Sequence, residues 1–93
     1  MNVTYSQEAI ADLIRLREFI AIKNPQATQK IAASIRKGIS QLKTFPYLGI
    51  EVEQAPNPEM IRDLIIGNYI ARYLLHAKQI YILRVWHHKE KRL

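Results

Sequence analysis

The apolar residues in the first half of the chain recur every three or four positions, which is the spacing of a helix buried on one side. Between residues 7 and 22 these positions are Ile10, Leu13, Ile14, Leu16, Phe19 and Ile20. Ser6 precedes them as a helix N-cap, and Glu8 stands in the first turn, where a carboxylate interacts favourably with the positive helix end. The pattern predicts a helix over residues 7–22.

A second helix is predicted from Pro25 to Lys43. Asn24 and Pro25 are a restart signal, because asparagine suits the N-cap and proline suits the first helical position. The apolar positions that follow are Ala27, Ile31, Ile35, Ile39 and Leu42. Gly38 costs this helix about 1 kcal/mol relative to Ala and is compatible with the close approach of another backbone. The short connection makes the two helices an antiparallel hairpin.

The second half of the chain predicts strands. Three runs rich in Ile, Leu, Val, Tyr and Trp cover residues 60–66, 69–76 and 80–87. Gly67-Asn68 is a two-residue hairpin signal between the first two runs, and residues 77–79 form a weaker break before the third.

Two shorter segments complete the pattern. Residues 2–5 favour a strand and are expected to join the same sheet. Residues 50–59 are polar and contain Pro56 and Pro58, which are disfavoured inside strands, so they are expected to form a loop.

Alternation along the strands predicts which residues share a face of the sheet. On residues 69–76 one face carries Tyr69, Ala71, Tyr73 and Leu75. On residues 80–87 one face carries Ile80, Ile82, Arg84 and Trp86, and the other carries Tyr81, Leu83, Val85 and His87. The helical hairpin must cover one face of the sheet, because neither layer can bury its apolar side alone. We therefore predict one α+β domain over residues 1–93, with the order β-α-α-β-β-β, a mainly antiparallel sheet and one partly open face.

Charge is distributed unevenly along the chain. The net charge is +6. Residues 1–59 hold seven Lys or Arg and six Asp or Glu, a net of +1, whereas residues 60–93 hold seven against two, a net of +5. A field of one sign on one part of a small domain favours an anionic partner, such as nucleic acid or an acidic protein.

The composition also limits which cellular compartment and which metal or disulfide chemistry are compatible with this protein. The chain has no cysteine, so thiolate metal sites and disulfides are excluded, which suits a reducing compartment. The N-terminus shows no signal peptide, and no apolar run approaches the roughly 18 residues that span a bilayer. We expect a cytoplasmic protein with no membrane partner, no metal and no cofactor.

Several segments, in their order and spacing, resemble the RelE/ParE superfamily of toxins from bacterial toxin–antitoxin pairs. They are Val3-Thr4-Tyr5-Ser6, Asn24-Pro25-Gln26-Ala27, Leu42 with Phe45-Pro46 and Gly49, Arg62-Asp63-Leu64, Tyr69-Ile70-Ala71-Arg72-Tyr73, and residues 80–88 with the basic residues that follow. The last segment, Ile-Leu-Arg-Val-Trp-His-His-Lys-Glu-Lys-Arg, resembles the ParE branch most. The resemblance implies a small toxin that a cognate antitoxin neutralises, and the sequence contains no signal for the antitoxin-binding residues.

The two branches of the superfamily imply different activities. ParE-like members inhibit DNA gyrase by binding, whereas RelE-like members cleave mRNA on the ribosome. Cleavage through the 2′-hydroxyl needs a base, an acid and cations that stabilise the phosphorane. The corresponding middle-strand positions here hold Ile61, Asp63 and Ile70, which cannot supply that positive charge. We therefore expect a gyrase inhibitor without its own covalent chemistry; the alternatives are an mRNA endonuclease and a partner that binds only antitoxin or operator DNA.

The candidate target-binding residues lie in the basic second half of the chain. They are Arg62, Arg84, Trp86, His87, His88, Lys89, Lys91 and Arg92. If the protein were a nuclease, the catalytic candidates among them would be Arg62, Arg84, His87 and His88. Arg62 and Arg84 are expected either to reach the open face or to pair internally with Asp63, Asp12 or Glu18, because an unpaired buried charge is costly. His87 and His88 are expected to point to opposite faces, as neighbours in a strand do.

Overall fold

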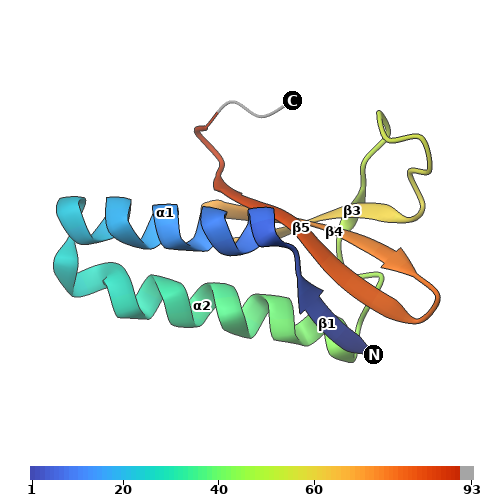
Figure 1. Cartoon of the computed structure of the whole chain (residues 1–93), viewed down its shortest axis with the longest axis horizontal. Helices are drawn as coiled ribbons and strands as arrows, with labels where there is room; N and C mark the ends of the chain where they lie inside the picture. Colours follow the sequence, from blue (N-terminus) through green and yellow to red (C-terminus); the bar gives the residue numbers. More distant parts are fainter. Residues whose placement is uncertain (91–93) are drawn as a thin grey trace.

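Two helices pack against one five-stranded sheet (Figure 1). The computed structural model describes residues 1–90; Lys91 and Arg92, two of the predicted target-binding residues, lie outside the described residues. The elements are β1 (Asn2–Tyr5), α1 (Gln7–Lys23), a 3₁₀ turn (Pro25–Ala27), α2 (Thr28–Ser40), a second 3₁₀ turn (Gln41–Lys43), β2 (Ile50–Glu51), β3 (Ile61–Ile66), β4 (Tyr69–His76) and β5 (Gln79–His87).

The sheet has the strand order β1-β5-β4-β3-β2. β1 runs parallel to β5, and every other neighbouring pair is antiparallel. The last strand of the chain therefore occupies an interior position between the first strand and β4. The predicted α+β fold, with a helical hairpin on a mainly antiparallel sheet, is confirmed.

The helices form where the apolar spacing predicts them. Ser6 caps α1 by accepting a hydrogen bond from the backbone N–H of Ala9 at 3.0 Å. The second helix is shorter than predicted, because both ends of the expected Pro25–Lys43 segment are 3₁₀ turns, which are frequent at helix termini. The two helices lie side by side in Figure 1, and α1 packs on β5 while α2 packs on β3.

The core lies between the helical hairpin and one face of the sheet. Its buried residues are Ala9, Leu16, Ile35, Ile39, Leu42, Leu64, Ala71, Tyr73, Leu75, Ile80, Ile82 and Val85. Gly38 lies against β3, because a Cβ at this position would meet the side chain of Ile66 at 2.8 Å. The close approach predicted for Gly38 is therefore to a side chain and not to another backbone.

Three local predictions are corrected by the structure. Residues 50–51, expected in a loop, pair with β3 as the edge strand β2. The break after β4 is a two-residue turn in which Ala77 and Lys78 have φ of 52° and 62°, and Gln79 already belongs to β5. A turn of this kind needs positive φ at both central residues, and the sequence contains neither glycine nor asparagine there.

The third correction concerns the faces of β5. Arg72 pairs with Arg84 and Tyr73 with Ile82, so Leu83 is an extra residue in a β-bulge. The bulge reverses the alternation, and Val85 consequently shares the core face with Ile80 and Ile82, contrary to the prediction.

No helix within residues 1–90 has the length and apolar character that crossing a membrane requires.

Candidate functional site

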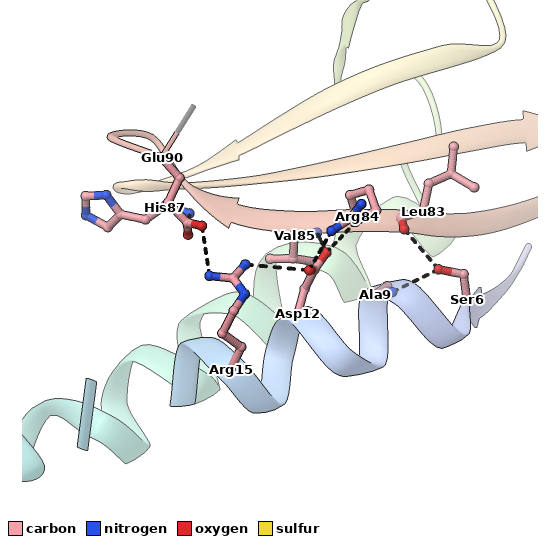
Figure 2. A network of polar contacts seen from close by, with 9 residues as sticks. All are labelled: Ser6, Ala9, Asp12, Arg15, Leu83, Arg84, Val85, His87 and Glu90. Carbon is pink, nitrogen blue, oxygen red and sulfur yellow. Dashed lines mark hydrogen bonds and ion pairs between the residues drawn. The ribbon is translucent and has the colours of Figure 1, made fainter. Parts of the chain in front are cut away.

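β1 pairs only with residues 79–82 of β5. Beyond the end of β1, the outer edge of β5 therefore faces α1. Three side chains bind the backbone groups that this edge leaves without a strand partner (Figure 2). The hydroxyl of Ser6 donates to the carbonyl of Leu83 at 2.9 Å, and the carboxylate of Asp12 accepts from the N–H of Val85 at 2.9 Å. Glu90 accepts from the N–H of His87 at 3.0 Å. A further strand is thus excluded from this edge.

Asp12 is the centre of this edge. It is 3% exposed, and it forms a two-point ion pair with Arg84, with distances of 2.8 Å from Nε and 3.0 Å from Nη2. The hydrogen bond to Asp12 raises the pKa of Arg84. Of the two outcomes expected for Arg84, the structure shows the internal pairing with Asp12.

Arg15 connects Asp12 to the end of the described chain. Its guanidinium lies 3.5 Å from Asp12 and donates to Glu90 at 2.8 Å (Figure 2). Glu90 also closes a turn by donating its backbone N–H to the carbonyl of His87. The position of residues 88–90 is therefore tied to α1.

Arg62 lies on β3, beside the opposite edge strand β2. It donates to the carbonyl of Gly49 at 3.0 Å and to Glu51 at 3.3 Å, and its guanidinium lies 5.1 Å from the ring centroid of Tyr47. These contacts hold the segment before β2 against β3. The terminal nitrogens of Arg62 are thus engaged within the chain, whereas its Nε is buried without a hydrogen-bond partner among the described residues.

Trp86 is 5% exposed, which leaves little of its ring for a partner. The guanidinium of Arg72 lies 5.2 Å from the ring centroid, in the range of a cation–π contact, and the same guanidinium binds Asp63 at 2.8 Å and 3.0 Å. Base stacking on Trp86 would require Arg72 to move away. Arg72, like Arg62 and Arg84, is thus a strand arginine that pairs within the chain.

His87 and His88 do not point to opposite faces, contrary to the prediction. β5 ends at His87 and the chain turns, so the two rings stack with centroids 4.7 Å apart and planes 29° apart. The ring of Tyr69 meets His87 edge-on at 5.2 Å. Strand alternation did not apply to His88, because this residue lies in a turn.

The protonation of His87 follows from its surroundings. Burial lowers its pKa, the charges of His88 and Lys89 lower it further, and Glu90 opposes them. Its Nδ1 accepts a hydrogen bond from the backbone N–H of Lys89 at 3.1 Å, so the proton of the neutral ring is on Nε2. Burial and Glu90 raise the pKa of Tyr69, which therefore keeps its phenolic proton near neutral pH.

A groove of about 520 Å³ opens between α1, α2 and the end of β5. We call it the His87 groove; it is lined by Arg15, Leu16, Phe19, Ile20, Lys23, Asn24, Ile31, Tyr69, His87, Lys89 and Glu90. Apolar side chains from both helices form most of its wall, and charged residues lie at its rim. It contains neither Arg62 nor Arg84.

Comparison with known proteins supports the relationship suggested by the sequence. The family model described as the ParE toxin of the parDE type II toxin–antitoxin system matches residues 3–92. The chain belongs to the ParE toxin family. The resemblance to the RelE/ParE superfamily is thereby confirmed, and membership implies an antitoxin as partner.

Two known proteins are similar to this ParE-family toxin over nearly its whole length. The protein named Toxin RelE2 of Caulobacter vibrioides is 26% identical over 86 residues, which cover 92% of this chain and 93% of that protein. A solved structure of the chromosomal ParDE system from P. aeruginosa has a TM-score of 0.78 at 21% identity, with 94% of this chain and 95% of that chain covered. The second likeness establishes the shared fold.

Arg62 and His87, two of the predicted site residues of this ParE-family toxin, do not converge. Arg62 lies opposite Tyr73 on β4, and His87 lies opposite Tyr69 on the same strand. Four residues of a strand span about 13 Å, and β3 and β5 are two strand spacings apart, so Arg62 and His87 belong to different parts of the sheet. Of the predicted residues that the structure describes, only His87 and Lys89 line the groove.

Sequence reasoning missed Arg15, Tyr69 and Glu90 as members of this region. Asp12 was considered only as an internal partner of an arginine. The available signal was its position: a carboxylate at residue 12 lies between the buried Ala9 and Leu16, on the apolar side of α1, where an unpaired charge is costly. Among residues 1–90, no three His, Asp or Glu side chains are grouped as ligands of a metal ion.

Proposed function

We propose that this protein is the toxin of a toxin–antitoxin module, that it inhibits DNA gyrase by binding, and that its cognate antitoxin neutralises it. Membership in the ParE toxin family is the basis for the toxin role and the antitoxin partner. The assignment of DNA gyrase as the target is our inference. The observation that supports it is the internal pairing of the strand arginines. Arg84 binds Asp12, Arg72 binds Asp63, and Arg62 binds Gly49 and Glu51.

This pairing disfavours phosphodiester cleavage at the predicted site. A phosphorane needs cations whose charge is directed at it in a shared cleft. The guanidinium groups of Arg62, Arg72 and Arg84 are already bound to carboxylates of the chain, and His87 is two strands away from Arg62. An inhibitor that acts by docking requires no such convergence.

The target surface that we propose is the basic segment after β5. His88 and Lys89 belong to it, and Lys91 and Arg92 continue it in the sequence. Trp86 and Arg62 contribute to it less than predicted, because the indole is buried and the guanidinium holds the segment before β2. The hydrogen bond between Arg15 and Glu90 holds the described part of this segment against α1.

The direct test uses purified toxin and DNA gyrase. We expect the toxin to inhibit supercoiling and to leave cleaved DNA, and we expect Lys89→Glu to weaken both effects. Lys30→Glu is a matched charge reversal on the exposed face of α2, and it should behave as the wild type. Full supercoiling activity at stoichiometric excess of toxin over gyrase would refute the proposal.

Cleavage of mRNA on the ribosome is the second candidate. Two observations favour it: a relative carries the name Toxin RelE2, and His87, Tyr69 and Lys89 meet at one groove. In this alternative the imidazolium form of His87 would be the general acid and would return to the neutral ring on donating its proton. Translating ribosomes challenged with the toxin should then show cuts in the A site, and His87→Gln should abolish them. Uncut messages would exclude this candidate, and the absence of growth arrest as well would favour a partner that binds only antitoxin or operator DNA.

A further inference from the structure

We propose that the exposed side of α2 binds the phosphate backbone of duplex DNA without reading its sequence. We call this surface the basic face of α2; its members, with the first residue of the following turn, are Lys30, Ser34, Arg36, Lys37, Ser40 and Gln41. This activity is additional to the proposed inhibition of gyrase and requires neither gyrase nor the antitoxin. In Figure 1 α1 lies between α2 and the segment after β5, so the two proposed surfaces are separate.

The charged residues in and around α2 are all basic. Residues 24–50 contain four Lys or Arg and no Asp or Glu. The net charge of +1 for residues 1–59 conceals this local excess, because the six acidic residues of that part lie before residue 19 or after residue 50. A helix of 13 residues therefore carries a field of one sign, which attracts an anionic partner.

The positive charge of this face is not neutralised by carboxylates of the chain. The ion pairs among residues 1–90 are made by Arg15 and by the three strand arginines. Lys30, Arg36 and Lys37 take part in none of these pairs. The carboxylate of Asp63 lines the same cleft as Lys37, but it is already bound by a strand arginine. The charges of the basic face are therefore available to a partner.

The helical repeat gives these charges a spacing that suits a row of phosphates. Lys30 and Lys37 are seven residues apart, so they project from the same side of α2 and are separated by about 10.5 Å along its axis. The phosphates of one DNA strand rise about 3.4 Å per nucleotide, so this distance corresponds to about three of them. The side chains of Ser34, Ser40 and Gln41 add hydrogen-bond donors of the kind that bind phosphate oxygens.

The basic face lacks the side chains that other anionic partners require. Residues 24–44 contain no aromatic residue, so single-stranded nucleic acid has no ring to stack on. Protein interfaces depend on aromatic anchors and are depleted in lysine. The apolar side of α2 faces the core, with Ile35 and Ile39 only 3% and 1% exposed, so it is not available for insertion into a lipid surface.

The shape of the helix favours DNA over double-stranded RNA. A helix with its side chains is about 10–12 Å wide, and the major groove of B-DNA is about 12 Å wide. Ala33 and Ser34 are small exposed residues between the two lysines, so the backbone of α2 is able to approach the groove closely. The major groove of A-form RNA is too narrow for side chains to enter.

The test measures fluorescence anisotropy of a labelled DNA duplex of about 20 base pairs titrated with the full chain. We expect binding that weakens with salt and is equally tight for two duplexes of unrelated sequence. Lys30→Gln and Lys37→Gln should each lower the affinity at least threefold. The double variant should reduce the slope of log K against log salt by about 2, because each lost phosphate contact removes about 0.9. Both lysines are exposed, so the variants should unfold at the wild-type temperature.

Lys78→Gln is the matched control, because Lys78 is exposed in the turn between β4 and β5 and lies outside α2. It should lower the affinity less than twofold. An equal loss in all three single variants would mean that net charge alone determines binding, and it would overturn the assignment to α2. A duplex that does not bind the wild type would overturn it as well.

Two further probes distinguish the anionic partners. An RNA duplex of the same sequence and vesicles of phosphatidylserine and phosphatidylcholine should each bind at least fivefold more weakly than the DNA duplex. Equal or tighter binding of either probe would overturn the assignment to DNA.

The gyrase assay reports on the other surface. Lys30→Glu should lose affinity for the duplex and still inhibit gyrase, because it leaves the segment after β5 unchanged. A failed gyrase assay together with a selective loss of DNA binding in the α2 variants would refute the proposed target and support the DNA-binding surface.

Discussion

One carboxylate oxygen of Asp12 accepts hydrogen bonds both from Nε of Arg84 at 2.8 Å and from the backbone N–H of Val85 at 2.9 Å. The side chain of a helix thus binds a strand edge where the sheet has no further strand. Asp12 is buried, so its charge is tolerated only while both partners are in place. This relationship makes α1 and β5 interdependent.

Removing the carboxylate of Asp12 should destabilise the fold. Asp12→Ala leaves the N–H of Val85 without this acceptor and removes the two-point partner of Arg84, and we expect the free energy of unfolding to fall by about 2–4 kcal/mol. Chemical denaturation measures this loss. Glu18→Gln, an exposed change in the same helix, should alter stability by less than about 0.5 kcal/mol. An equally small effect of Asp12→Ala would contradict the assigned role.

A substitution in the turn between β4 and β5 should increase the stability of the fold. Lys78 adopts φ of 62°, a left-handed conformation that costs a non-glycine residue roughly 1 kcal/mol or more. Lys78→Gly should therefore raise the free energy of unfolding by about 1 kcal/mol. The reverse change at the other hairpin, Gly67→Ala, should lower it by a similar amount, because Gly67 has φ of 58°. Thermal unfolding of both variants tests these two predictions. Melting temperatures that shift in the same direction in the two variants would refute the argument.

The hydroxyl of Tyr73 should hold the segment before β2 against the core. It accepts from the N–H of Gly49 at 2.9 Å and donates to the carbonyl of Pro46 at 2.7 Å. Tyr73→Phe leaves these two backbone groups without a partner, and we expect a loss of about 1–3 kcal/mol in unfolding free energy. Hydrogen exchange at Gly49 should accelerate in this variant. Tyr81→Phe is the matched control on β5, because Tyr81 is exposed; comparable losses in both variants would exclude a specific role for Tyr73.

The stability of the fold should depend on pH through His87. Its pKa is lowered from 6.5 in the folded chain, so the unfolded chain binds the proton more readily. The stabilising contribution is therefore fully present above pH 6.5 and is lost as the pH falls below 6.5 through the folded pKa. NMR titration of the His87 ring should give a pKa under 6.5. Glu90→Gln should lower this pKa further, because the charge of Glu90 raises it; an increase would contradict the account.

The elements that follow a regular period were predictable from the sequence. The helical spacing around Leu16 and Ile35 located both helices, and Gly67-Asn68 located the first hairpin, because each signal is local in the chain. The bulge at Leu83 was not predictable, because it depends on pairing with β4. It reversed the expected faces of Val85 and Trp86.

The candidate site was predicted less well than the fold. The basic character of the end of β5 followed from composition, and His87 and Lys89 do line a groove. The contributions of Arg15 and Tyr69 depend on tertiary contacts between α1 and the sheet, which no periodicity encodes. The engagement of Arg62 with Gly49 depends in the same way on a backbone carbonyl, which has no signature in the sequence.

The interior position of β5 has a consequence for synthesis of the toxin. The chain emerges from the ribosome with β1, both helices and β2 to β4 before β5, yet β5 lies between β1 and β4 and supplies three fully buried side chains, Ile80, Ile82 and Val85. A product terminated before residue 79 therefore has no means of joining its first strand to the rest. We therefore expect the native sheet to form only when translation is almost complete.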